Sequence, residues 1–189
     1  MNAVDVAVAE VKELSVVLEG VDSAETTALV NEIISAGRIF VGGAGRTLLS
    51  MKTFAMRLMQ IGFECYLVGE VCTPSIKGGD LLVVASHSGT TSVTLEVVRK
   101  AKSHGARTAV LTAYPGTPIP SACDCVVGFP LSYDSSDDNN PALTFSKLHT
   151  PGNIPEAAIT LILDGVIVEL MYRQGITGQI LLDNHANLE

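Results

Sequence analysis

Residues 80–91 read DLLVVASHSGTT, and no other stretch of the chain is as informative about its architecture. Its apolar run, residues 81–85, is almost continuous, as in the strands of parallel sheets that helices cover on both faces. The run leads directly into a turn rich in hydroxyl groups. Residues 92–104 then have the apolar spacing of a helix that stops at Gly105. The stretch therefore predicts a buried strand over residues 80–85, a polar turn and a helix in immediate succession.

The same alternation of strands and helices recurs on both sides of this stretch. Residues 4–36 have the spacing of one long helix or two short ones, and residues 48–61 form another helical pattern before Gly62. Short connections between strands and helices predict right-handed βαβ units. We therefore expect an α/β three-layer sandwich with a five-stranded parallel sheet in the flavodoxin-like order 2-1-3-4-5. The expected strands are residues 38–42, 65–68, 80–85, 108–112 and 125–128.

The last third of the chain departs from this alternation. Residues 131–153 follow no periodicity and are expected to form a long loop, a class that is more often functional than idle. A strongly apolar helix is expected over residues 156–173, followed by a polar tail. At 189 residues the chain suits one core. We expect one domain over residues 1–189, with a helical segment at 1–37 and the C-terminal helix and tail at 155–189.

Composition excludes several classes of partner. The formal net charge of -8 disfavours nucleic acid, which needs a basic face. No apolar run suits a membrane span and no secretory signal is evident, so we expect a cytoplasmic protein without a membrane partner. Because 47% of the residues are hydrophobic and only 17% are charged, a homo-oligomer is expected to cover some apolar surface. The four cysteines have no metal-ligand or redox spacing, so no metal site is expected.

Two polar turns mark the expected ligand site. In a sheet of this order, the helices after the first and third strands leave on opposite faces and open a crevice between their turns. These turns are residues 42–47 (GGAGRT) and 86–91 (SHSGTT). Each turn starts a helix and so presents backbone N–H groups and the positive end of a helix dipole. The pair therefore predicts an anion site.

The hydroxyl groups of the second turn favour phosphate as the anion. Ser86, Ser88 and Thr91 offer three donors, and Gly89 would let the backbone approach the ligand. The alternative is that these residues only cap the helix near Ser92, but one hydroxyl normally does that. Phosphate binding is therefore the favoured interpretation.

The first turn does not support a nucleotide cofactor. Gly43 and Gly45 have G-x-G spacing, but Leu48 stands where a dinucleotide site has its third glycine. The phosphate-binding motif of nucleotide hydrolases is also absent, so no cofactor is expected. Arg46 can bind a substrate oxygen or a carboxylate, or can simply be a solvated surface residue.

These residues resemble the sugar isomerase (SIS) family, whose phosphosugar loop has the pattern S-x-S-G-x-T. Within that family the chain is most similar to the 6-phospho-3-hexuloisomerases, whose loop is usually S-G-S-G-E-T. His87 and Thr90 therefore depart from that group, and Thr47 stands where it usually has serine. The wider likeness includes Gly45-Arg46-Thr47, FAMRLMQIGFECYLVGE, TPSIKGGDLLVVAS and the C-terminal HANLE.

The resemblance implies a reaction, a base and an assembly. The reaction is metal-independent interconversion of 3-hexulose 6-phosphate and fructose 6-phosphate through an enediol, in a homotetramer. The implied base is Glu156, although an acid at a helix start can also merely interact with the dipole. His185 is expected to assist ring opening, in its own or a neighbouring subunit's site. The substrate-binding residues expected are Gly45, Arg46, Thr47, Ser86, His87, Ser88, Gly89, Thr90 and Thr91.

Some alternatives stay open at this stage. His87 could contact the phosphate or a sugar hydroxyl, and His149 could fold over the ligand from the long loop. A non-catalytic phosphosugar sensor is one alternative function. An isomerase acting on a different sugar phosphate is another.

Overall fold

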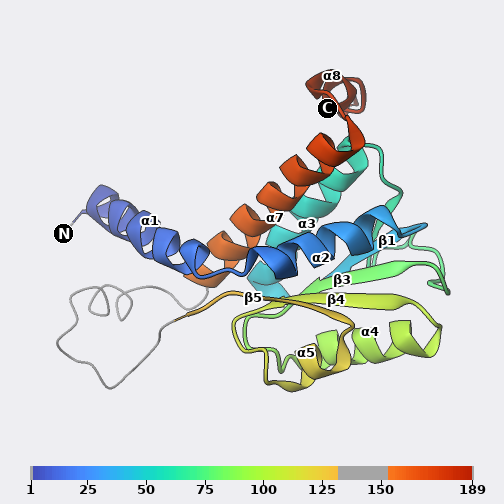
Figure 1. Ribbon diagram of the computed structural model, residues 1–189, viewed down its shortest axis with the longest axis horizontal. Coiled ribbons are helices and arrows are strands. Elements are labelled where there is room, and N and C mark those ends of the chain that lie inside the picture. Colours follow the sequence, from blue (N-terminus) through green and yellow to red (C-terminus); the bar gives the residue numbers. More distant parts are fainter. Residues whose placement is uncertain (1, 132–152, 189) are drawn as a thin grey trace.

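The sheet has the order and direction expected from the sequence. Figure 1 shows the computed structural model, which describes residues 2–131 and 153–188. Within these residues, five strands form one all-parallel sheet in the order β2-β1-β3-β4-β5. The fold class and strand order are therefore confirmed. The strands are β1 (Ile39–Gly42), β2 (Cys65–Leu67), β3 (Leu81–Ala85), β4 (Arg107–Thr112) and β5 (Cys125–Gly128).

Helices cover both faces of the sheet and make it the middle of three layers. In Figure 1, α2, α3 and α7 lie on one side of the sheet and α4 and α5 on the other, while α1 projects beyond the sheet. The helices are α1 (Ala3–Glu19), α2 (Ser23–Ile34), α3 (Gly45–Gln60), α4 (Ser92–Ser103), α5 (Pro118–Ala122), α7 (Asn153–Gln174) and α8 (Gly178–Asp183). Most of the loop expected over 131–153, including His149, lies outside the described residues.

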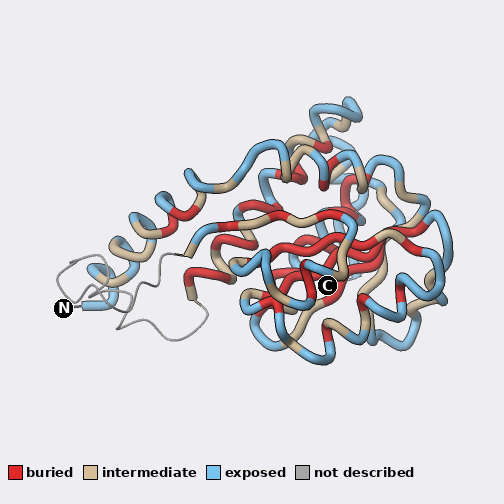
Figure 2. Tube along the Cα trace, turned by 60° about the horizontal axis from the view of Figure 1, so that its bottom comes forward, coloured by how far each residue is buried: buried red, intermediate tan, exposed pale blue. Residues whose placement is uncertain are grey.

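The strand sequences explain the two cores. Successive side chains of a strand point to opposite faces, so a strand covered on both sides needs apolar residues throughout. Val41 of β1 joins the core cluster beneath α3 and α7, whereas its neighbour Phe40 joins the cluster beneath α4 and α5. Every residue of β3 is buried. Figure 2 shows this burial as red tube through the centre of the molecule.

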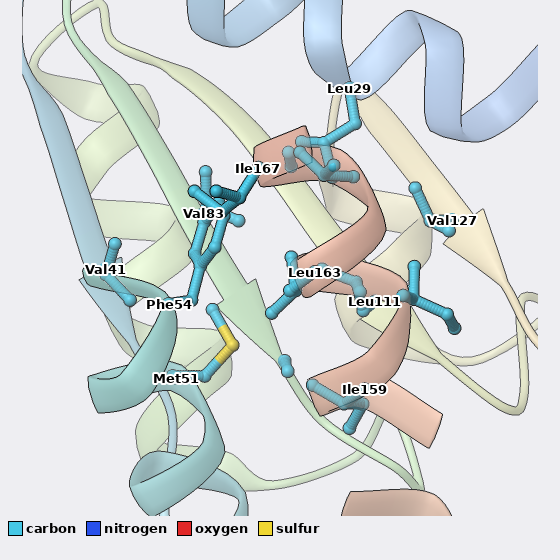
Figure 3. Close-up of a cluster of buried hydrophobic side chains, with 14 of the residues drawn as sticks. Leu29, Val41, Met51, Phe54, Val83, Leu111, Val127, Ile159, Leu163 and Ile167 are labelled. Carbon is cyan, nitrogen blue, oxygen red and sulfur yellow. The ribbon is translucent and has the colours of Figure 1, made fainter. Parts of the chain in front are cut away.

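The larger core fixes the position of α7. Figure 3 shows Ile159, Leu163 and Ile167 of α7 beside the strand residues and beside Met51 and Phe54 of α3. All five of these side chains are buried. Full burial of one such side chain stabilises a fold by about 1.5–3 kcal/mol. The register of α7 against α3 is therefore strongly determined, and with it the position of the first turn of α7.

Several boundaries differ from the sequence-based expectation. Helix α3 begins at Gly45 instead of residue 48, and α7 begins at Asn153 instead of residue 156. The short helices α5 and α8 were not expected at all. Pro118 suits the first position of a helix because its missing N–H has no partner there anyway, but a proline-rich stretch is usually interpreted as a loop. In the part of the chain that the structure describes, no helix has the length and hydropathy needed to cross a bilayer.

Candidate active site

The two polar turns lie at the same edge of the sheet. Strands β1 and β3 are parallel neighbours, with Gly42 opposite Val84, so the turns that follow them start side by side. Helix α3 then covers one face of the sheet and α4 the other. Gly45, at the start of α3, has a φ of 57°, a left-handed conformation that glycine adopts without strain. The two turns therefore start at the same edge of the sheet and lead into helices on opposite faces, as the strand order predicts.

The hydroxyl groups of the second turn bond to one another. The Oγ atom of Ser86, a buried residue, lies 3.1 Å from Oγ1 of Thr91. The Oγ atom of Ser88 accepts hydrogen bonds from the backbone N–H and the hydroxyl of Thr90, at 3.3 and 3.0 Å. Thr91 is the N-cap of α4, yet its side chain makes no capping hydrogen bond. Helix capping therefore does not explain Thr91, and the start of α4 suits an anion.

Gly89 has a structural role that sequence reasoning did not supply. Its φ of 63° lies in the left-handed region, and its carbonyl accepts a hydrogen bond from the N–H of Ile119 at 2.9 Å. A Cβ atom added here would lie 1.8 Å from Oγ1 of Thr117. The glycine is thus needed for the shape of the loop and its contact with α5, whether or not a ligand approaches it.

Glu156 joins the first turn of α7 to the first turn of α3. Thr47 donates a hydrogen bond from Oγ1 to Oε1 of Glu156 at 3.2 Å, and Nε of Arg46 lies 4.0 Å from Oε2. Ser50 donates from Oγ to the backbone carbonyl of Glu156 at 3.2 Å. The Glu156 side chain is only 13% exposed. The carboxylate therefore faces the first polar turn rather than solvent at the helix end.

Asn153 is a site residue that the sequence analysis missed. Its Oδ1 accepts a hydrogen bond from Nη2 of Arg46 at 3.4 Å, and its Nδ2 donates to Oε1 of Glu10 on α1 at 3.0 Å. Residues three apart lie on neighbouring parts of a helix surface. The spacing from Asn153 to Glu156 was therefore a signal that could have found it, had α7 been started three residues earlier.

His87 is held inside the second turn. Its backbone carbonyl accepts hydrogen bonds from the N–H of Ala113 and the hydroxyl of Thr112, both at 3.2 Å. Its ring lies against Tyr114, with the ring centroids 5.6 Å apart. Burial lowers the pKa of His87 below its ordinary value, and the negative charge of Glu156 partly opposes this shift. The neutral imidazole is therefore favoured near pH 7.

His185 does not lie near Glu156 within the same chain. It is exposed in the turn after α8, and its neighbour Asn184 donates a hydrogen bond to the carbonyl of Gln60 at the far end of α3. A helix of 16 residues is about 24 Å long. Within one chain, His185 therefore lies far from Glu156, which contacts the start of α3. A role in the site of the same chain has no support from this placement.

Side chains that could bind a metal ion do not form a cluster in the described part of the chain. Among the residues that the structure describes, no group of three or more histidine, cysteine, aspartate or glutamate side chains could hold a metal ion. Burial raises the pKa of Cys65 to about 12 and that of Cys123 to about 11, so these thiols resist ionisation. Cys72, by contrast, is exposed.

The chain is similar to proteins of one family. The model of the SIS domain matches residues 32–146. A 3-hexulose-6-phosphate isomerase of Methylomonas aminofaciens is 37% identical over 95% of this chain and 96% of its own length. A 3-hexulose-6-phosphate isomerase of Bacillus subtilis is 36% identical over 89% of each chain.

A solved structure agrees with these relatives. A Methanococcus jannaschii protein, for which a 3-hexulose-6-phosphate isomerase function has been inferred, superposes with a TM-score of 0.75. It is 32% identical, and the match covers 88% of this chain and 86% of that one. Together with the parallel sheet and the S-x-S-G-x-T turn, these matches establish that the chain belongs to the SIS domain family.

Proposed function

We propose that the chain is a phosphosugar isomerase that interconverts 3-hexulose 6-phosphate and fructose 6-phosphate without a metal ion. The observation that carries this proposal is the position of the Glu156 carboxylate, which accepts a hydrogen bond from Thr47 in the first of the two polar turns. Two curated relatives that match nearly the whole chain are named 3-hexulose-6-phosphate isomerase. Their names favour an isomerase over a non-catalytic sensor.

The phosphate is assigned to the turn at residues 86–91. Ser88 is exposed there and its hydroxyl can rotate toward a ligand, while the N–H groups at the start of α4 lie next to it. Hydrogen bonds to a charged group typically contribute about 1.5–3 kcal/mol each. Binding the phosphate here leaves the carbon chain of the sugar to extend toward Glu156.

Glu156 is assigned as the base. For fructose 6-phosphate, the carboxylate takes the proton from C3, the C–H electron pair forms the C2=C3 bond of an enediol, and the proton returns at C2. One carboxylate suffices because the two carbons are neighbours. Among the described residues, Oε2 of Glu156 has no hydrogen-bond partner, so its capacity to accept a proton is not used within the chain.

His185 is assigned to the site of a neighbouring subunit. It is exposed and distant from Glu156 of its own chain, and imidazole can exchange protons near pH 7. With O6 phosphorylated, the 3-ketose has no hydroxyl able to close an unstrained five- or six-membered ring, whereas fructose 6-phosphate is mainly cyclic. We therefore assign to His185 the opening and closing of the fructose ring.

The proposal includes one domain over residues 1–189, a cytoplasmic location and a homotetramer. Exposed apolar side chains support the assembly. They include Leu49 and Met56 on α3 and Val168 and Tyr172 on α7. Contact between subunits would bury these side chains, which are exposed to water in the single chain.

An NMR assay in deuterated solvent tests the function. The protein is incubated with fructose 6-phosphate, and deuterium is located in the recovered sugars. Label at C3 of fructose 6-phosphate, together with appearance of the 3-ketose, is expected. Label at C1 would instead indicate an isomerase that produces an aldose phosphate. Tight sugar-phosphate binding without any deuterium exchange would indicate a non-catalytic sensor instead of an enzyme.

A further inference from the structure

Among the residues that the structure describes, three buried side-chain polar atoms lack a hydrogen-bond partner. One is Oγ1 of Thr94 on α4, and the other two belong to the candidate active site: Nε2 of His87, in the second turn, and Oε2 of Glu156, at the start of α7. Buried polar side-chain atoms are bonded in the large majority of cases, because an unsatisfied one costs about 1–3 kcal/mol. Their presence together points to a shared ligand that satisfies both.

The imidazole of His87 is in a fixed position. Hydrogen bonds from Thr112, the last residue of β4, and from Ala113 hold its backbone carbonyl, and the ring of Tyr114 lies against its own ring. The Glu156 carboxylate is near enough for its charge to act on the imidazole. A group held this way loses little freedom when a substrate binds, as a catalytic group requires.

The proposed reaction needs a second proton exchange that Glu156 does not perform. While the carboxylate moves a proton between C2 and C3, one oxygen of the sugar must gain a proton and its neighbour must lose one. Neutral imidazole suits this task, because one ring nitrogen carries a proton and the other accepts one.

We propose that His87 is a second catalytic residue, which exchanges protons with the O2 and O3 atoms of the sugar while Glu156 exchanges protons with C2 and C3. This inference rests on the proposed function. In the direction from fructose 6-phosphate, Glu156 removes the proton of C3 and Nε2–H of His87 gives its proton to O2 as the C2=O electron pair moves onto that oxygen. The imidazolate then takes the proton of O3 as the C3=O bond forms and C2 receives the proton held by Glu156. Both residues end in their starting states.

The test compares carbon exchange with turnover. In His87→Gln the side-chain amide can still donate a hydrogen bond near the position of Nε2 but cannot pass on a proton. Glu156 should still form an enediolate, so solvent deuterium should still enter C3 of fructose 6-phosphate. Turnover to the 3-ketose should fall by about 10²-fold or more. The ratio of exchange to turnover should therefore rise at least about 10-fold. His104→Gln is the matched control, because His104 is exposed at the end of α4.

Each outcome decides the inference. An unchanged ratio, with or without slower turnover, would give His87 only a structural or binding role and overturn it. The same holds if His87→Gln matches the His104→Gln control. His87→Asn is measured as well, in case the glutamine variant does not fold. A wild-type protein with neither exchange nor turnover would overturn the proposed function and this inference together, so the two failures are distinguishable.

Discussion

The hydroxyl of Thr47 donates a hydrogen bond to Oε1 of Glu156 over 3.2 Å, although 109 residues separate the two in the chain. This bond connects the first turn of α3 to the first turn of α7. Because α3 starts at one of the two polar turns, the orientation of Glu156, the proposed base, depends directly on a turn that we propose to bind the ligand.

Thr47→Val should therefore slow the reaction without unfolding the protein. Valine has the shape of threonine but cannot donate to Glu156, whereas Thr47→Ser keeps the donor. We expect kcat to fall by about 10- to 150-fold for valine, since a hydrogen bond to a charged group is worth about 1.5–3 kcal/mol, and to change little for serine. Steady-state kinetics of both variants checks this. Equal rates for the two would mean that the hydrogen bond does not orient the base.

Glu156→Gln should abolish catalysis and spare binding. Glutamine keeps the shape of the side chain but cannot accept the proton of C3. Loss of a general base typically lowers the rate by about 10²- to 10⁴-fold. Deuterium exchange should disappear to the same extent, while calorimetry should find sugar-phosphate affinity within a few-fold of the wild type. Full activity in this variant would place the base elsewhere.

His185→Ala should slow conversion of the cyclic ketose more than that of the open 3-ketose, because only the former needs its ring opened. Mixed oligomers test which subunit supplies the imidazole. Co-assembly of His185→Ala chains with Glu156→Gln chains should create some sites that contain both native residues, and partial recovery of turnover is expected. No recovery above the separate variants would argue against a shared site.

Ser88→Ala should weaken binding of sugar phosphates. The Oγ atom of Ser88 accepts two hydrogen bonds from Thr90, so its own proton remains available to a phosphate oxygen. Its loss should cost about 1.5–3 kcal/mol of binding free energy. Ser103→Ala, at the exposed end of α4, is the matched control. If calorimetry finds equal sugar-phosphate affinity for both variants, the phosphate does not bind at this turn.

Gly89→Ala should destabilise the whole protein. The left-handed φ alone costs an alanine about 1–2 kcal/mol, and the contact with Thr117 adds to this. For a protein of this size, each 1 kcal/mol lowers the Tm by about 2–4 °C. Gly116→Ala is the control, because nothing lies within 4 Å of its added Cβ and it has no positive φ. Similar melting temperatures for the two variants would show that the loop can adjust.

The sheet could be predicted because its strands are buried on both faces. A run such as residues 81–85 has no polar position, so no competing periodicity obscures it. The strand order follows from the alternation with helices, and it in turn places the two polar turns together. Neither step needs knowledge of side-chain contacts.

The remaining site residues depend on contacts that no local pattern reveals. Tyr114 packs against His87 because β4 lies next to β3, and Asn153 reaches Arg46 because α7 packs along α3. Only the turns after β1 and β3 were expected to form the site, although the turn after β4 starts at the same edge of the sheet. The separation of His185 from Glu156 could not be predicted either, because only a polar tail was expected where the structure has α8.

Helix α7 follows every strand in the chain, and it both covers the larger core and carries Glu156. During synthesis the two polar turns can therefore form before Glu156 exists. A nascent chain that lacks α7 would leave the apolar surface beneath Ile159, Leu163 and Ile167 open to solvent and to other chains. Completion of the proposed site and burial of this apolar surface thus occur in the same folding event, when α7 docks.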